Sequence, residues 1–346
     1  MLAGRLHLDD RRFAVEEVPV PEPGPDEVLI AVQAAGVCLS DVHLIDGTLR
    51  PSFNTAGVVT LGHEVAGVVH TVGSAVPAGW APGTRVALQA GQTCGQCANC
   101  VRHRSPCQQI RTRGVDYDGG WAEFALARHD TLVAIPDTLP FDQASIIPDA
   151  VSTPYAAIVV TAGVRPAQSV GIWGVGGLGV HGVRVARLAG AAPIIAVDPL
   201  PGARERALAA GADVALDPTD PGFATAVAAA TGGRGIDAAF DFAGVAAVRN
   251  QAATVLAPGG QLVLVGLTAE PITVANGTLF SFKGNVLRGH YGSGASHVED
   301  LIRLAGSGRL DLGPSISAHI PLADAAAAVE QLEHKEGDPI RLILVP

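Results

Sequence analysis

The fold of this chain is decided by the stretch SVGIWGVGGLG at residues 169–179. A short apolar segment, expected to be a strand, runs into a glycine loop with the spacing G-x-G-x-x-G, and a helical pattern follows over residues 178–188. In this motif the first glycine permits a tight turn, the second admits a phosphate to the backbone, and the third lets helix and strand pack closely. Because 42 glycines produce such spacings by chance, a turn without a ligand is the alternative interpretation.

The residues after the loop favour a bound dinucleotide. A second strand is expected over residues 193–198, and its last residue, Asp198, lies nineteen positions after Gly179. The carboxylate can accept hydrogen bonds from an adenosine ribose diol and would repel a 2′-phosphate, which favours NAD over NADP. The pyrophosphate would lie at the N-terminus of the helix, where free N–H groups and the helix dipole favour anions.

Two kinds of pattern divide the chain. Strands expected over 214–216, 238–241 and 261–265, with a helix over 204–210, continue the alternation and imply a parallel sheet covered by helices on both faces. The first 150 residues are β-rich, with short strands expected over 27–34, 67–73 and 84–88, and suggest an irregular barrel-like domain. From about Arg288 the alternation stops. A helix over 322–332 and a strand over 341–345 are expected to return to the first domain.

Composition narrows the class of protein. A chain of 346 residues with 48% hydrophobic residues has enough apolar material for two cores. Its net charge of −10 argues against broad binding to nucleic acid or to an anionic membrane. No unbroken apolar stretch is long enough for a transmembrane helix, and the first ten residues contain no apolar signal core. We therefore expect a soluble, cytoplasmic protein.

Four of the five cysteines gather in residues 94–107. A pair of disulfides is one interpretation, but a two-domain chain without a secretion signal has little need of them. Tetrahedral Zn²⁺ fits better, because it takes four thiolates and the C-x₂-C spacing lets one loop wrap the ion. The sequence thus predicts a structural zinc site whose ligands are Cys94, Cys97, Cys100 and Cys107.

A second group contains the remaining cysteine. Cys38 and, further on, His63 could supply two of the three protein ligands of a catalytic zinc, which keeps its fourth position for water or substrate. A lone cysteine is usually a small buried hydrophobe, and a lone histidine is usually a polar residue with satisfied hydrogen bonds. The spacing alone leaves both interpretations open.

Taken in order, these motifs resemble a zinc-dependent alcohol dehydrogenase of the medium-chain dehydrogenase/reductase superfamily over essentially the whole length. The resemblance implies an α/β fold class with two domains. A β-rich GroES-like catalytic domain is expected over residues 1–150 and is completed by 289–346. A Rossmann domain with a doubly wound parallel sheet is expected to bind the cofactor over residues 151–288.

The resemblance also implies the ligands of two zinc ions per chain. Cys38 matches the first ligand of the catalytic zinc, and His63 in the group Gly62-His63-Glu64 matches a further one. Asp149 stands at the position of the third ligand, which is a cysteine in many members of the family. The four-cysteine group resembles the structural-zinc lobe. Its last gap holds six residues, one fewer than the usual spacing.

The same resemblance assigns roles to further residues. Ser40 matches a hydroxyl that bonds the substrate oxygen, and His43 matches a histidine that passes a proton onward by way of the cofactor ribose. Asp41 and Glu64 resemble carboxylates that orient the metal ligands. Residues implied to contact NAD are Gly174, Gly176, Gly177, Leu178, Gly179, Asp198, Thr153, Val265, Gly266 and Arg341.

The implied reaction is the reversible oxidation of a primary or secondary alcohol to an aldehyde or ketone, with hydride transfer to NAD. Ala203 departs from the family, which often has a basic residue there; Arg204 is adjacent. Ala90 and Leu49 suggest room for substrates bulkier than ethanol. Alternatives are a polyol dehydrogenase, an NADPH-dependent carbonyl reductase, a zinc-free quinone reductase relative, and a non-catalytic dinucleotide-binding protein. We expect a small-molecule substrate and a homodimer or homotetramer.

Overall fold

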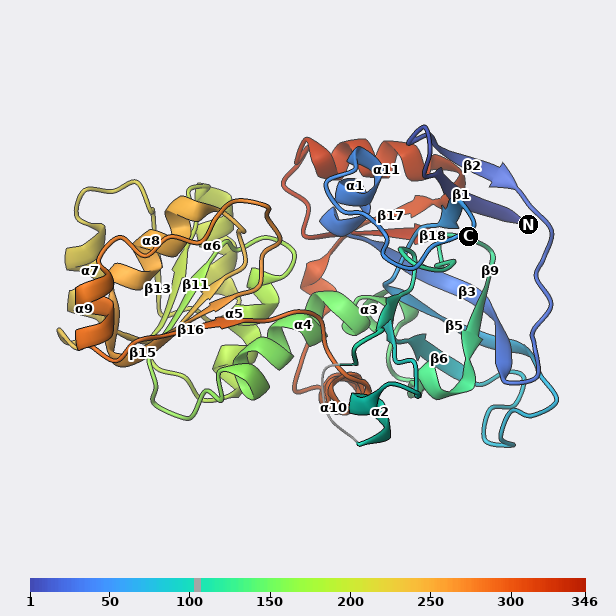
Figure 1. The fold of residues 1–346 in the computed structure, drawn as a ribbon, viewed down its shortest axis with the longest axis horizontal. Helices are drawn as coiled ribbons and strands as arrows, with labels where there is room; N and C mark the ends of the chain where they lie inside the picture. Colours follow the sequence, from blue (N-terminus) through green and yellow to red (C-terminus); the bar gives the residue numbers. More distant parts are fainter. Residues whose placement is uncertain (103–106) are drawn as a thin grey trace. The chain divides into compact units, whose positions relative to one another are not determined.

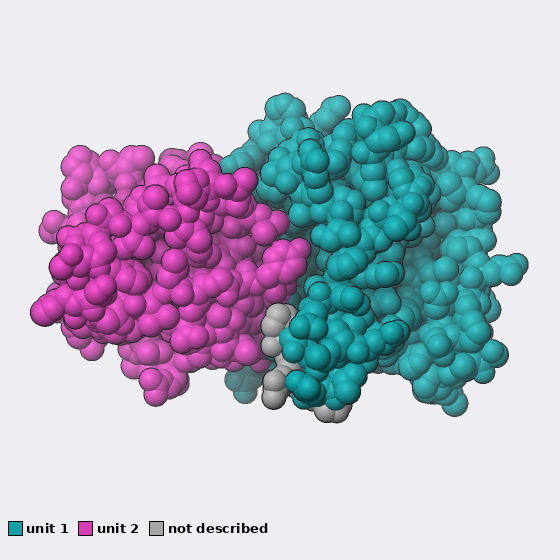
Figure 2. Space-filling view, in the orientation of Figure 1, with its two compact units in different colours: residues 1–152, 293–346 teal, residues 153–292 magenta. Residues whose placement is uncertain are grey.

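The structure is a computed structural model that describes residues 1–102 and 107–346. The chain forms two compact units, coloured separately in Figure 2. Unit 1 comprises Met1–Ser152 and Ser293–Pro346, and unit 2 comprises Thr153–Gly292. The polypeptide therefore leaves unit 1 once, builds unit 2, and returns to unit 1 with its C-terminal segment.

Unit 2 contains a six-stranded parallel sheet with the order β13-β12-β11-β14-β15-β16. The order reverses between β11 and β14, which is the doubly wound arrangement and confirms the predicted fold class. Its strands are β11 (Val170–Trp173), β12 (Ile194–Val197), β13 (Val214–Leu216), β14 (Ile236–Asp241), β15 (Leu256–Leu264) and β16 (Val286–Gly289).

Helices connect and cover these strands (Figure 1). α5 packs on β11 and β12, α6 on β12 and β13, and α8 on β11, β14 and β15. The second helix begins at Pro201, three residues before the expected Arg204, because proline is well suited to the first helical position. The helices are α5 (Gly179–Leu188), α6 (Pro201–Ala209), α7 (Phe223–Ala230), α8 (Ala246–Thr254) and α9 (Gly277–Phe282).

Unit 1 is built on a larger sheet whose main path is β10-β6-β5-β3-β18-β17, with β9 also paired to β3. Separate sheets are formed by β2-β1-β4 and by β7-β8. The strands are β1 (Leu2–His7), β2 (Phe13–Glu17), β3 (Glu27–Val37), β4 (Val58–Thr60), β5 (Val65–Val72), β6 (Arg85–Leu88), β7 (Gly91–Gln92), β8 (Arg111–Thr112), β9 (Phe124–Arg128), β10 (Leu132–Ala134), β17 (Ile316–Pro321) and β18 (Arg341–Val345).

The C-terminal segment completes this unit. β18 pairs antiparallel with the end of β3, where Leu342 lies opposite Val37. One apolar core contains Ile30 of β3, Leu344 of β18 and Leu332 of the C-terminal helix. The helices of unit 1 are α1 (Leu39–Asp46), α2 (Ala98–Val101), α3 (Phe141–Ser145), α10 (Ala295–Gly306) and α11 (Ala325–Glu333), while α4 (Ser152–Tyr155) spans the boundary. The expected helix 322–332 is thus a 3₁₀ turn, Leu322–Asp324, followed by α11.

Wide helical turns flank the boundary of the units. Ile147–Val151 and Ala156–Thr161 are π-helical, and Asp149 lies in the first of these segments. Ser152 donates a 2.8 Å hydrogen bond to the Pro148 carbonyl. π-helical turns are rare and are frequently found at functional sites. This backbone places Asp149 near residues from two distant loops.

Candidate functional site

The cysteine group of residues 94–107 forms a compact cluster of four free thiols. Its Sγ atoms are 3.5 Å apart for Cys97 and Cys100, 3.6 Å for Cys94 and Cys107, and 3.9 Å for Cys94 and Cys100. Four sulfurs at about 2.3 Å from one zinc lie about 3.8 Å from each other in an ideal tetrahedron. The residues therefore fit a tetrahedral zinc ion.

Backbone N–H groups surround these sulfurs. The amide of Cys97 donates to Cys94 Sγ at 3.3 Å, and the amides of Cys100 and Gln108 donate to Cys97 Sγ at 3.5 Å. The hydrogen bonds from Cys100 and Gln108 lower the pKa of Cys97 to about 6, whereas desolvation raises the pKa of Cys100 to about 12. Donors aimed at a sulfur stabilise the thiolate, which is the form that binds a metal.

A second cluster brings together Cys38, His63, Glu64 and Asp149. Cys38 precedes α1, His63 lies between β4 and β5, and Asp149 is supplied by the π-helical turn. Asp149 Oδ2 lies 3.3 Å from His63 Nε2 and 3.7 Å from Cys38 Sγ. For one nitrogen, one oxygen and one sulfur around a tetrahedral zinc, these separations should be about 3.3 and 3.6 Å. The three side chains therefore fit a zinc ion.

Asp41 lies against Cys38 and His63 of this cluster, which we call the mixed cluster because its side chains differ in type. Its Oδ2 accepts the Cys38 amide at 2.9 Å, and its Oδ1 lies 3.5 Å from His63 Nδ1. Burial opposes protonation of His63, but Asp41 and Asp149 outweigh it and hold the pKa of His63 well above its ordinary value. A carboxylate on one imidazole nitrogen directs the other nitrogen to the position where a metal would be bound.

Glu64, the fourth member of this cluster, forms a buried ion pair with Arg341. Arg341 Nη2 lies 3.2 Å from Glu64 Oε1, and both side chains are at most 2% exposed. A Cβ at position 36 would lie 2.1 Å from Glu64 Oε2, so any residue larger than glycine there would displace this carboxylate. Burial raises the pKa of Glu64 to about 7, although the Arg341 charge opposes this shift. The structure thus places Arg341, predicted from the sequence to contact the cofactor, against Glu64.

Ser40 and His43 lie on α1 close to this cluster. Ser40 Oγ is 3.6 Å from Cys38 Sγ, so its hydroxyl belongs to the immediate surroundings of the thiol. His43 is one turn further along the helix and is half-buried. The helix therefore carries Ser40, Asp41 and His43 from one short segment.

The glycine loop of unit 2 has the shape that the motif requires. Gly174 adopts φ +83°, and a Cβ on Gly179 would lie 1.8 Å from the Gly174 carbonyl oxygen. A Cβ on Gly176 would meet no atom within 4 Å. Gly177 and Leu178 complete the loop before α5. The open space at Gly176 and the helix N-terminus fit the pyrophosphate of a dinucleotide.

Asp198 closes this loop at the carboxyl end of β12. Its Oδ2 accepts the Val175 amide at 2.8 Å and its Oδ1 accepts the Leu200 amide at 2.9 Å. An ionised carboxylate has about four acceptor positions, so two hydrogen bonds leave capacity for a ribose hydroxyl. The residue is 8% exposed, and the position and chemistry of this carboxylate fit the adenosine ribose of a dinucleotide.

The predicted nicotinamide contacts lie at the same edge of the sheet. The amides of Val265 and Gly266 both donate to the Asp241 carbonyl, at 3.0 and 2.8 Å. Asp241 also forms a 2.8 Å ion pair with Arg249, which is 6% exposed and which the sequence did not reveal. A helical arginine eight residues after a strand gives no local signal of such a pairing. Thr153 begins unit 2 and is buried.

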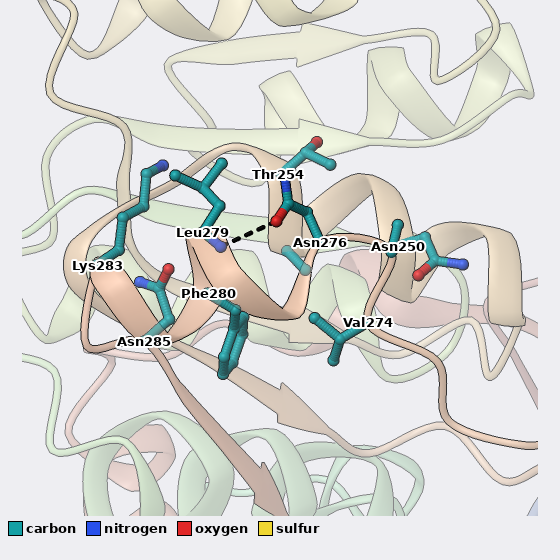
Figure 3. Close-up of a pocket in the computed structure, with 10 residues that line it drawn as sticks. Asn250, Thr254, Val274, Asn276, Leu279, Phe280, Lys283 and Asn285 are labelled. Atoms are coloured by element: carbon teal, nitrogen blue, oxygen red, sulfur yellow. Dashed lines mark hydrogen bonds between the residues drawn. The ribbon is translucent and has the colours of Figure 1, made fainter.

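A further recess, shown in Figure 3, lies between α8, α9 and the loop before α9. Asn276 caps α9 there by accepting the Leu279 amide at 2.9 Å. The recess is lined by Asn250, Ala253, Thr254, Val274, Ala275, Asn276, Leu279, Phe280, Lys283 and Asn285, and no residue of the predicted site is among them.

Across the part of the chain that the structure describes, no helix combines the length and apolarity needed to cross a membrane.

Comparisons with known proteins agree with this geometry. Residues 24–137 match the alcohol dehydrogenase GroES-like domain and residues 177–307 match the zinc-binding dehydrogenase domain. An L-threonine 3-dehydrogenase of Pyrococcus horikoshii is 33% identical over 87% of this chain and 86% of that protein. An NDMA-dependent alcohol dehydrogenase of Amycolatopsis methanolica is 32% identical over 99% of this chain and 98% of that protein. A zinc-binding dehydrogenase structure from Sinorhizobium meliloti 1021 is bound to NADP. Its match covers 100% of this chain and 99% of that chain, with a TM-score of 0.91 and 28% sequence identity.

Proposed function

Because the chain belongs to the zinc-dependent alcohol dehydrogenases of the medium-chain dehydrogenase/reductase superfamily, we propose that it oxidises a primary or secondary alcohol reversibly to an aldehyde or ketone, with hydride transfer to NAD. The observation that carries this proposal is the convergence of Cys38, His63 and Asp149 with the spacing of tetrahedral zinc ligands. Three protein ligands leave one position for the substrate, as catalytic zinc sites require.

The two clusters have different roles in this proposal. Cys38, His63 and Asp149 would hold the catalytic zinc, and the four cysteines from Cys94 to Cys107 would hold a structural zinc. When bound, the catalytic ion supplies Lewis acidity, which makes a hydroxyl more acidic and polarises a carbonyl. Asp41 keeps His63 in the orientation needed for binding, and Arg341 compensates the buried charge of Glu64.

The polar residues of α1 would transfer the proton that the alcohol loses. Ser40, whose Oγ lies 3.6 Å from Cys38 Sγ, would accept that proton at Oγ while donating its own onward. His43 lies one helical turn away and is half-buried, so its imidazole would pass the proton on toward solvent. Substitution of either residue should therefore slow the reaction more than it weakens zinc binding.

NAD is the proposed hydride acceptor. The open space at Gly176 supports a pyrophosphate in the glycine loop, and the carboxylate of Asp198 supports a ribose without a 2′-phosphate. Val265 and Gly266, at the carboxyl edge of the sheet, would face the nicotinamide. The similar structure from Sinorhizobium meliloti is bound to NADP, so the test compares both cofactors.

The test is a spectrophotometric screen for reduction of NAD and NADP by alcohols. The panel should include ethanol, longer, branched and cyclic alcohols, threonine, sorbitol and 2,3-butanediol. We expect at least one alcohol to reduce NAD, with activity lost on chelation and restored by zinc. Two bound zinc ions per chain without reduction of either cofactor by any alcohol would instead favour a non-catalytic dinucleotide-binding protein. A clear preference for NADPH would favour a carbonyl reductase.

A further inference from the structure

An arginine is held between three oxygens at the edge of the proposed cofactor site. Arg204 Nη1 donates to the backbone carbonyl of Asp198 at 2.7 Å and to that of Pro199 at 2.8 Å. The same nitrogen lies 3.2 Å from Asp217 Oδ2. Within the described residues, all hydrogen bonds of this guanidinium run through Nη1. The side chain is 23% exposed, so Arg204 is not sealed in the interior.

Asp217 and Asp198 occupy equivalent positions on neighbouring strands. β12 and β13 are parallel, with Val197 paired to Leu216, so each aspartate directly follows its strand. The Asp198 amide donates to the Leu216 carbonyl at 3.1 Å, which ties the two strand ends together. Both carboxylates therefore lie at the carboxyl edge of the sheet, where ligands of this fold bind.

The orientation of Asp217 is fixed by its own turn. Its Oδ1 accepts hydrogen bonds from the Thr219 amide at 2.8 Å and from Thr219 Oγ1 at 2.7 Å. These hydrogen bonds, with the charge of Arg204, lower the pKa of Asp217. Oδ2 is thus left directed at Arg204 as an ionised acceptor. Arg206, two residues further on α6, donates to the Val175 carbonyl at 3.0 Å.

We propose that Asp217 determines dinucleotide specificity by pairing with Arg204, which would otherwise bind the 2′-phosphate of NADP. This inference rests on the proposed function, because it requires a dinucleotide whose ribose lies at Asp198. Arginine is the side chain best suited to phosphate, since its guanidinium can donate two parallel hydrogen bonds. Asp217 neutralises the positive charge of Arg204. The backbone carbonyls of Asp198 and Pro199 restrain the position of the guanidinium.

The decisive variant is Asp217→Asn, with binding of NADH and NADPH measured by fluorescence titration. Asparagine keeps Oδ1 for Thr219 and replaces the charged acceptor Oδ2, which faces Arg204, with an uncharged NH₂ group. We expect the ratio of NADPH to NADH affinity to rise about tenfold, which corresponds to about 1.4 kcal/mol. A loss of structure alone would weaken both ligands together and leave the ratio unchanged.

Two further variants identify the mechanism. In Arg204→Gln/Asp217→Asn the ratio should return to within about twofold of the unsubstituted protein, because the arginine that binds phosphate is absent. Asp213→Asn is the matched control: Asp213 precedes β13 at its opposite end and lies 3.7 Å from Arg187. It removes the same charge from the same strand and should leave the ratio unchanged.

Three results would overturn the inference: an unchanged ratio in Asp217→Asn, a raised ratio that persists in the double variant, or an equal rise in Asp213→Asn. These titrations need no alcohol turnover, so they separate this inference from the proposed function. If the unsubstituted protein binds neither NADH nor NADPH, both fail. If it binds NADH but Asp217→Asn does not move the ratio, only the role of Asp217 fails.

Discussion

The two thiol-containing clusters of unit 1 are built in opposite ways. The cysteine cluster comes from a single segment, residues 94–107, has four identical donors, and is stabilised by backbone N–H groups. The mixed cluster takes Cys38, His63 and Asp149 from three distant segments and is packed against charged side chains. Cys38 is 3% and His63 is 4% exposed, whereas three of the four clustered cysteines are only half-buried.

We propose that this difference separates a structural role from a chemical one. Four thiolates fill the coordination sphere of zinc and leave no position for a substrate, while three ligands leave one position open. In the mixed cluster, Asp41 lies beside His63, and Glu64 is paired with Arg341. Substitutions in the two clusters should therefore affect different properties.

The largest effect is expected from His63→Ala in the mixed cluster. Loss of this ligand should lower kcat/KM for alcohol oxidation by about 10³-fold or more, because several kcal/mol of transition-state stabilisation depend on the metal. The exposed His70 on β5 provides the control, and His70→Ala should change kcat/KM by less than about twofold. Steady-state kinetics check both; a His63→Ala enzyme with near-normal kcat/KM would remove the catalytic role of this cluster.

Next in size is the effect of Arg341→Met on stability. With its partner 0% exposed, the substitution removes the charge that opposes protonation of Glu64, so this carboxyl is left buried without its partner and must take up a proton. The free energy of unfolding should fall by about 1–3 kcal/mol. Urea denaturation at fixed free zinc measures this. Adding Glu64→Gln should recover part of the loss. A decrease below about 1 kcal/mol would show that the ion pair does not support the cluster.

A smaller effect is expected when Asp41 is replaced by asparagine. Loss of the charge beside His63 Nδ1 should weaken zinc binding at the mixed cluster about 10- to 100-fold. Competition with a chromogenic chelator can resolve this, because the cysteine cluster should keep its affinity. If zinc binding were weakened equally at both clusters, Asp41 would act on the fold of unit 1 rather than on one ligand.

The smallest effect on the reaction is expected from Cys97→Ser. The variant should lose the zinc of the cysteine cluster and unfold at a lower temperature, because a structural zinc contributes folding free energy. At saturating zinc its kcat should stay within about threefold of the unsubstituted enzyme. Calorimetry and kinetics on one preparation check this, and a large loss of kcat without loss of stability would contradict the division of roles.

Features encoded locally could be predicted from the sequence, and features formed by distant residues could not. The glycine loop and alternating strands and helices are contiguous patterns, and the six-stranded parallel sheet confirms the fold class they indicated. The mixed cluster came from a family resemblance, since Cys38 and Asp149 are far apart in the chain, and its metal remains a prediction. The Glu64–Arg341 and Asp241–Arg249 pairs were missed because no periodicity marks a contact between elements.

The division between the two clusters is tested most directly by zinc content, measured by mass spectrometry together with alcohol oxidation in three proteins. We expect two zinc ions per chain in the unsubstituted enzyme, and one in each of His63→Ala and Cys97→Ser. Oxidation should be lost in His63→Ala and retained in Cys97→Ser. The division would be contradicted if His63→Ala kept both zinc ions and full activity, or if activity disappeared with the zinc of the cysteine cluster alone.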